Sequence, residues 1–315
     1  MPSRRAGHLP ISFSDLLKSG PFFYSEKIHI SFKQTPDSDD ILFAVRRNPM
    51  NREAMFEATM MRVEHKYPMN RRQAELFLKK AMPHLEKDVY PEYDLHNIYY
   101  DTPDNALIIN CLGHPQYKEK LRLRTYGEPD EQTPCFLEIK KKFKTTGVKR
   151  RIAVSEQEAS AYMNEHQPLE DHSQIAREID YLVKRGNLAQ KMFIAYHRKA
   201  FSGIEERDLR ITFDTDICYR LDHLSLHKTG EEKMITNEED VLMEIKVSDR
   251  YPLWLTEILT ELKLYRQTFS KYGTIYSELE SRRRCETTAV PVCRNRPAFH
   301  PVYEKKENMT CLTQS

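Results

Sequence analysis

Charged residues alternate with apolar residues in several short segments of this 315-residue chain. Lys120, Arg122 and Arg124 stand two residues apart in KLRLRTY, and Glu138 and Lys140 do so in FLEIKKK. In a strand, residues two apart share a face, so these segments would gather charge on one face. Arg and Lys suit phosphate oxygens, and the carboxylates among them suit a divalent metal that bridges phosphates. The pattern therefore favours the binding of a multiply charged phosphate compound.

The same alternation recurs in four further segments. Their polar members are Arg62, Glu64, Lys66, Tyr196, Arg198, Arg210, Thr212, Asp214, Glu244 and Lys246. Any one such strand fits an ordinary half-solvated sheet, but an exposed face would mix Thr, Ser and Gln with both signs of charge. Here Arg and Lys dominate, so we interpret the face as the lining of an enclosed channel. Its cations need water, carboxylates or a polyanion, and a polyphosphate chain or a nucleoside triphosphate meets that need.

The elements that would position these residues follow from composition and period. Strands are predicted at 62–67, 96–101, 120–126, 135–142, 148–154, 192–198, 209–215 and 241–247. Helices are predicted at 71–85, 155–166, 252–265 and 269–283. If the helices cover the apolar strand faces from outside, the charged faces line the lumen. The predicted fold is therefore α+β, a closed antiparallel barrel of about eight strands that forms a charged tunnel with flanking helices.

Three regions are expected along the chain. Residues 1–58 are predicted to be a loop-rich N-terminal extension with one strand-like run, IHISFKQ. Residues 59–282 would form the tunnel domain. Residues 283–315 lack periodicity and are rich in Pro and polar residues, so a disordered tail is predicted.

The composition limits the class of protein more than its partners. Lys and Arg number 49 against 47 Asp and Glu, so the total charge does not indicate which kind of partner the protein binds. No apolar run approaches the ~20 residues of a membrane helix, and none of the six Cys stands in a CxxC pair. We expect a cytoplasmic protein with reduced thiols that does not bind nucleic acid. Attachment to the inner face of a membrane, or to a membrane protein, is left open, as is the oligomeric state.

The charged segments together resemble a known family. RVEHKY, KLRLRTY, FLEIKKK with VKRR, AYHRKAF, LRITFDTDI, VLMEIKV, PLWL and FSKYG occur in the order seen in the VTC (vacuolar transporter chaperone) polyphosphate polymerase domain. That domain belongs to the CYTH-like triphosphate tunnel metalloenzyme superfamily. The wider superfamily often has ExExK on its first strand, whereas Arg62 makes this motif RxExK, which is closer to the polymerase branch. The SPX and membrane domains of the fungal proteins are not evident.

The resemblance implies an activity and a set of site residues. It implies metal-dependent transfer of the terminal phosphoryl group of ATP to a growing inorganic polyphosphate chain, with Mn²⁺ or Mg²⁺ as the ion. The implied catalytic residues are Lys66, Arg122, Arg124, Lys140, Arg198, Arg210 and Lys271. The implied substrate-binding residues are Lys149, Tyr196, Ser270 and Lys246. Glu244 would bind the metal, and Glu64 and Glu138 are further candidates for the metal or for Lys partners.

Several assignments have alternatives. Lys141 and Arg150 have the opposite parity from their neighbours and are expected on the surface. A one-residue shift in register would exchange Lys149 with Arg150. Ser270 and Lys271 stand near a helix start, where they could simply cap it. For the whole protein, the alternatives are a hydrolase of tripolyphosphate or an organic triphosphate, and a polyphosphate-binding protein without catalysis.

Overall fold

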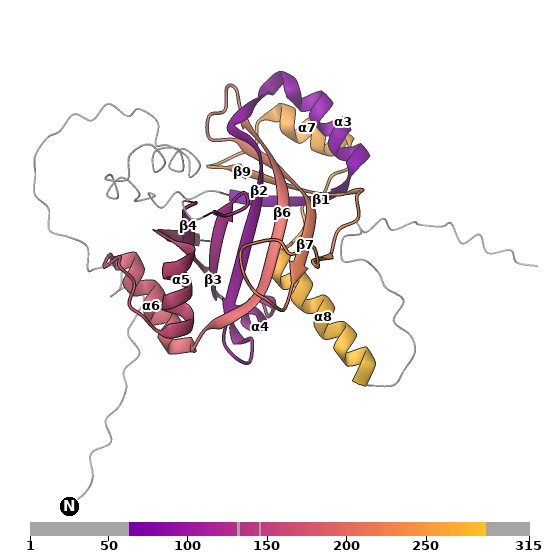
Figure 1. Cartoon of the computed structure of the whole chain (residues 1–315). Coiled ribbons are helices and arrows are strands. Elements are labelled where there is room, and N and C mark those ends of the chain that lie inside the picture. Colours follow the sequence, from indigo (N-terminus) through magenta and orange to yellow (C-terminus); the bar gives the residue numbers. More distant parts are fainter. Residues whose placement is uncertain (1–62, 131–132, 145, 288–315) are drawn as a thin grey trace, which may run out of the picture. The chain divides into compact units, whose positions relative to one another are not determined.

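The structure, a computed structural model, describes residues 63–130, 133–144 and 146–287 (Figure 1). The predicted extension 1–58 with its strand-like run, Arg62 and the tail from 288 onward lie outside the described residues. All eight predicted strands are present. They are β1 (Val63–Asn70), β2 (Leu85–Asp101), β3 (Tyr117–Tyr126), β4 (Cys135–Phe143), β5 (Thr146–Val154), β6 (Ala189–Gly203), β7 (Arg210–Arg220) and β9 (Asp240–Val247). The two-residue β8 (Lys233–Met234) was not predicted.

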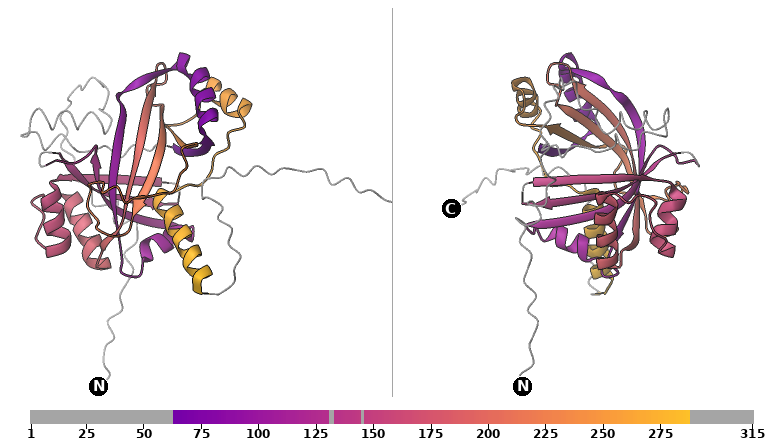
Figure 2. Two further views of the ribbon diagram at one scale, coloured as in Figure 1. Left: turned by 45° about the vertical axis from the view of Figure 1, so that its right-hand side comes forward. Right: turned by 90° about the vertical axis from the view of Figure 1, so that its left-hand side faces the viewer.

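The strands form one antiparallel sheet in the order β1-β9-β7-β6-β2-β3-β4-β5, with β8 paired to β7. Figure 2 shows that this sheet is strongly curved and twisted. No hydrogen bonds join β1 to β5 among the described strands, so the predicted closed barrel is corrected to an open, curved sheet. The reason lies at the free edge of β1, where Gln267 donates its backbone N–H to the carbonyl of Lys66 at 2.8 Å. The segment before the last helix thus occupies backbone that a closing strand would need.

The helices match the predictions in part. Four were predicted, namely α3 (Arg71–Ala81), α5 (Glu156–Glu165), α7 (Leu253–Glu261) and α8 (Lys271–Thr287). The helix predicted over 71–85 ends early, because Met82–His84, with Pro83, form a 3-10 turn before β2 begins. Helix α8 continues past 282, the predicted end of the domain. α4 (Ala106–Leu112) and α6 (Gln174–Gly186) were not predicted.

Two expectations about protein class can be compared with the described residues. No helix there combines the length and the apolar character needed to cross a bilayer. In this part of the chain Cys111, Cys135 and Cys218 are free thiols, whereas Cys293 and Cys311 lie outside it.

Four helices cover the apolar faces of the strands, as predicted. Helices α5 and α6 pack on β3, β4 and β5, where Ile179 and Leu182 meet Leu137 and Ile139. Helices α3 and α7 pack on β1, β9 and β7 at another part of the same sheet face (Figure 1). The opposite face carries Arg122, Arg124 and Arg198 and is called the inner face below. Its side chains are therefore left to line the concave side of the sheet.

Helices α4 and α8 depart from this scheme because they pack on the inner face. Tyr272 and Ile275 of α8 lie in one apolar cluster with Ile194 and Tyr196 of β6. A bulge in β7 contributes to this cluster. The pairing with β6 shifts between Ala195–Cys218 and His197–Thr215, and Asp216 takes a φ of 53°. The shift changes which residues of β7 face inward, so the inner face is charged along part of its length and apolar at one end.

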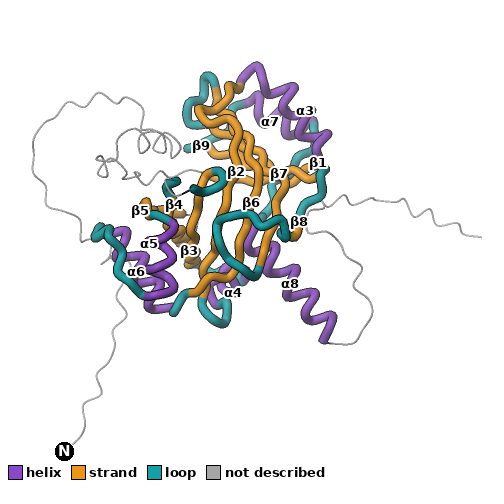
Figure 3. Tube along the Cα trace, in the orientation of Figure 1, coloured by secondary structure: helices purple, strands orange, loops and turns teal. Residues whose placement is uncertain are grey.

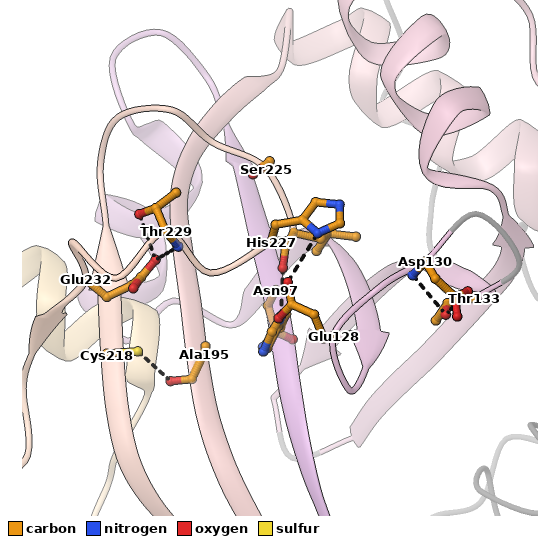
Figure 4. A network of polar contacts seen from close by, with 12 residues as sticks. Asn97, Glu128, Asp130, Thr133, Ala195, Cys218, Ser225, His227, Thr229 and Glu232 are labelled. Carbon is orange, nitrogen blue, oxygen red and sulfur yellow. Dashed lines mark hydrogen bonds and ion pairs between the residues drawn. The ribbon is translucent and has the colours of Figure 1, made fainter.

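A long loop connects β7 to β8 (Figure 3), and the buried side chain of Arg220 bonds it at several points. Arg220 donates to the carbonyls of Asp222, His223, Ser225 and His227, and it pairs with Glu232. Figure 4 shows two further contacts of this connection, Thr229 with Glu232 and His227 with Glu128 of the β3–β4 loop. One guanidinium therefore satisfies four backbone carbonyls and the Glu232 carboxylate.

Replacing Arg220 should destabilise the fold. Arg220→Ala leaves Glu232 buried without its cation and frees several carbonyls, so we expect the free energy of unfolding to fall by about 3–5 kcal/mol. Chemical denaturation followed by circular dichroism measures this. Arg207→Ala, which removes an exposed pair with Glu86 at 3.5 Å, is the control and should cost less than about 1 kcal/mol. Equal losses in both variants would contradict the role given to Arg220.

Candidate functional site

The inner face brings together side chains from all eight main strands and from the start of α8. Every residue implied by the family resemblance lies there. These are Lys66, Arg122, Arg124, Lys140, Arg198, Arg210, Lys271, Lys149, Tyr196, Ser270, Lys246, Glu244, Glu64 and Glu138. Their convergence follows from the registers of the paired strands and from the contacts between their side chains.

The β4–β5 pairing settles the register around Lys149. Lys140 lies opposite Lys149, and Ile139 lies opposite Arg150. Lys149 therefore faces inward with Lys140, and Arg150 faces outward. Arg150 and Lys141, which lie diagonally across this strand pair, both form ion pairs with Glu178 of α6 on the outer face. The surface positions expected for Lys141 and Arg150 are thus confirmed.

Cations stand side by side across β3, β4 and β5. Lys120, Lys140 and Lys149 occupy successive strands in register, and like charges opposite each other are unfavourable without a counterion. In the next row Glu138 lies between Arg122 and Arg151. Burial disfavours the charged form of Glu138, but the charges of Arg122 and then Arg124 outweigh it and hold its pKa well below the usual range. Glu138 is the one carboxylate on this part of the inner face within the described residues.

Carboxylates are more evenly matched on β1, β9, β7 and β6. Glu244 contacts Lys66 at 3.3 Å, Arg198 at 3.3 Å and Lys271 at 3.6 Å. Burial opposes its ionisation, yet the charges of Lys66 and Lys271 keep its pKa well below the usual range. Glu244 therefore stays ionised and connects three elements.

The site prediction omitted Asp214. Arg198 donates to both of its carboxylate oxygens, at 2.6 and 2.7 Å, and Lys271 donates to it at 2.5 Å. Asp214 is 0% exposed. A sequence signal was available, because Asp214 shares the parity of Arg210 in LRITFDT. Asp214 therefore orients both Arg198 and Lys271 before any substrate binds.

A tyrosine joins the two groups of charges. Arg124 donates to the Tyr196 hydroxyl at 3.0 Å and to Asn97 at 2.8 Å. Lys271 lies over the Tyr196 ring, 4.1 Å from its centroid. The Tyr196 side chain therefore contacts cations from β3 and from α8 at once.

The inner face is closed by side chains where its backbone is open. Glu64 of β1 lies 3.3 Å from Lys66 and 3.7 Å from Lys140 of β4, although these strands stand near opposite ends of the sheet order. The charge of Lys140 holds the pKa of Glu64 below its usual range. The contact requires the sheet to curl until its two ends approach each other. Polar side chains thus link the two ends of the sheet across its concave side.

Further inner-face residues were absent from the predicted site. Lys120 donates to Ser270 at 2.9 Å, which ties β3 to the start of α8. Arg210 lies 2.9 Å from Asp88. Arg122 donates to the Tyr99 hydroxyl at 3.3 Å. The parity of KLRLRTY places Lys120 beside Arg122, whereas Asp88 follows no alternating pattern and carried no signal.

Two inner-face groups titrate close to neutral pH. Burial, with the nearby charge of Arg198, lowers the pKa of Lys246 to about 8. Burial alone would raise the pKa of Tyr99, but the charges of Arg122 and Arg124 outweigh it and lower the pKa to about 8. The positive charge of the inner face therefore depends on pH in this range.

The oxygen groups around Glu244 fit a particular kind of metal site. Among the described residues, no three His, Cys, Asp or Glu side chains are grouped so as to hold a metal by themselves. Thr212 lies opposite Glu244, is 0% exposed, and its hydroxyl has no hydrogen-bond partner in the described part of the chain. Mg²⁺ is often held by one or two carboxylates and by substrate phosphates. The residues present suit such a shared site.

Comparisons with known proteins show the family. A search of curated proteins found no match. Among solved structures, a putative adenylate cyclase from Bacillus halodurans is 13% identical, with a TM-score of 0.44, over 67% of this chain and 96% of that one. A putative adenylyl cyclase from Hippeastrum, described as having a dominant triphosphatase activity, is 15% identical, with a TM-score of 0.44, over 69% and 96%. The VTC domain family matches residues 61–279, which is most of the chain, and the chain therefore belongs to the VTC domain family.

Proposed function

We propose that this chain is a metal-dependent polyphosphate polymerase, which transfers the terminal phosphoryl group of ATP to a growing polyphosphate chain. The supporting observation is the surplus of cations on β3, β4 and β5. Lys120, Lys140 and Lys149 occupy three positions in register, with Glu64 of β1 3.7 Å from Lys140, and the arginines beside them share Glu138. Such a surface needs a ligand with many negative charges spaced along its length. Polyphosphate and the triphosphate of ATP both have this property.

The titrating groups of the site favour an acceptor that is already ionised. The strand histidines lie on the outer face, where His96 bonds the Leu226 carbonyl and His197 contacts Glu92 and Asp94. The carboxylates of the inner face have lowered pKa values, which makes them weak bases. A water nucleophile gains little from such groups. The end of a polyphosphate chain needs no deprotonation at neutral pH.

Without a general base, catalysis of phosphoryl transfer would consist of aligning the reacting phosphates and neutralising their charge. Arg122, Arg124 and Lys140 would grip phosphate oxygens, with Lys149 and Lys246 adding charge along the path. Lys271, oriented by Asp214, would hold the transferred group from the side of α8. Glu244 and the Thr212 hydroxyl would hold a Mn²⁺ or Mg²⁺ ion together with the substrate phosphates. When bound, that ion supplies neutralisation of the charge that develops on the phosphate oxygens.

The reaction products distinguish the proposed activity from its alternative. The full chain, incubated with ATP and Mn²⁺, should give a ladder of long polyphosphate chains on a gel. Lys140→Ala should slow this by roughly ten- to a hundredfold, because it removes a charge-assisted contact worth roughly 1.5–3 kcal/mol. Lys140 is 53% exposed, so the variant should fold.

Lys141→Ala is the matched control. Lys141 is the next residue of the same strand but pairs with Glu178 on the outer face. Its variant should make the ladder at the parental rate. Orthophosphate as the only product of the parent would identify a hydrolase. Equal effects of the two substitutions would refute the use of the inner face.

Glu244→Gln should separate binding from turnover. The substitution removes a negative charge next to Lys66, Arg198 and Lys271, so affinity for inorganic tripolyphosphate without metal should hold or rise. Turnover with metal should fall by more than roughly tenfold, because an oxygen ligand of the ion is weakened. Calorimetry and the gel assay measure the two effects. Glu119→Gln is the control, because Glu119 lies on the outer face beside Arg185. If Glu244→Gln responded to metal as the parent does, Glu244 would not be a ligand of the ion.

Affinity for tripolyphosphate should depend on pH. From about pH 7 to about pH 9, Lys246 loses its positive charge and Tyr99 gains a negative one, since both pKa values are about 8. Both changes weaken the attraction for an anion, so affinity is highest below their pKa values and falls above them. Calorimetric titrations of the parent and of the Lys246→Met, Tyr99→Phe double variant measure this. The same pH profile in both proteins would show that these two groups are not responsible.

A further inference from the structure

Aromatic rings occupy one end of the inner face. Tyr93 of β2 and Tyr126 of β3 have ring centroids 5.8 Å apart, and Tyr126 meets Phe136 of β4 edge-on at 5.9 Å. Phe136 is fully buried, whereas both tyrosines are half-buried. Phe136 therefore supports Tyr126 from the side of the sheet, and the two tyrosines keep part of their surface open.

The side chains change in the same order along two neighbouring strands. On β3 the inner face runs from Tyr126 through two arginines to Lys120. On β4 it runs from Phe136 through Glu138 to Lys140, in register with β3. At about 3.3 Å per residue, Lys140 lies about 13 Å along the strand from Phe136. The face therefore grades from aromatic rings through arginines to lysines.

The aromatic end is connected to the cations. Arg151 donates to the Tyr126 hydroxyl at 3.4 Å, and Arg210 donates to the Tyr93 hydroxyl at 3.5 Å. The Arg124 guanidinium lies 5.9 Å from the Tyr126 ring centroid. If a ligand stacked on these rings, the phosphates attached to it would lie next to arginine side chains.

We propose that Tyr93 and Tyr126 form the platform for the base of a nucleoside triphosphate, and that this platform sets the direction of the substrate. The inference rests on the proposed function and adds the nucleoside site and the polarity to it. A base has a π face that stacks on aromatic rings. The arginine forks then hold the phosphates nearest the nucleoside, and the lysine row together with Lys271 holds the terminal phosphate. That row lies beside Glu64, where the acceptor chain is brought to the transferred group.

Inorganic tripolyphosphate has no base to stack on the rings. Loss of the rings should therefore weaken the binding of ATP and not that of tripolyphosphate. Tyr126→Leu and Tyr93→Leu remove the aromatic faces from the full chain, and Tyr126→Phe and Tyr93→Phe keep them. Calorimetry gives the affinities for ATP and for inorganic tripolyphosphate. Each Leu variant should bind ATP roughly tenfold more weakly, as expected for a lost base stack, and tripolyphosphate as the parent does. The Phe variants should bind both ligands as the parent does.

A second measurement uses the parent protein alone and so does not depend on the folding of a variant. ATP should bind roughly tenfold more tightly than ribose 5-triphosphate, which carries the same phosphates without a base. Equal affinities for these two ligands, or equal losses of ATP and tripolyphosphate in the Leu variants, would overturn the platform and leave the proposed function standing. A parent that binds neither ATP nor tripolyphosphate would overturn both.

Discussion

Electrostatic repulsion among buried cations is the constraint on which this structure depends. Lys66, Arg198 and Lys271 converge from three elements, and they can do so only because Asp214 and Glu244 lie between them. Removing one member of a buried pair costs about 3–5 kcal/mol, so these carboxylates belong to the fold as much as to the site. On β3, β4 and β5 the cations are not balanced in this way, because Glu138 supplies one negative charge among several arginines and lysines. The proposed binding of an anion by the inner face rests on that imbalance.

The two halves of the inner face therefore differ in kind. One half is internally neutralised and rigid, with Arg198 held by two hydrogen bonds to Asp214. The other half carries more cations than carboxylates, although Glu64 contacts Lys140 and Glu138 contacts Arg122. A substrate that lies between them meets fixed groups on one side and adjustable ones on the other. In the proposed transfer, the fixed groups would need no reorganisation.

Period-two alternation predicted most of the inner face because neighbours in a strand must point to opposite sides. It separated Lys140 from Lys141 correctly, and the pairing with Lys140 decided the case of Lys149. It did not predict which residues of β7 face inward after Asp214, because the bulge at Asp216 resets the parity. Closure was mispredicted because Gln267 reaches β1 from about two hundred residues away. Helix α6 was missed although Ser173 caps it and its apolar face is regular, whereas α4 is short and is capped by Asp101 from the end of β2.

The backbone bond between Gln267 and Lys66 has a consequence beyond the shape of the sheet. An uncovered edge strand offers its amides and carbonyls to any extended peptide, and a second copy of the chain is the most abundant one nearby. By covering β1 at this point, the segment that leads into α8 interrupts the template for intermolecular strand addition. The stretch of chain that brings Lys271 to the inner face thus also opposes strand-to-strand aggregation at this point.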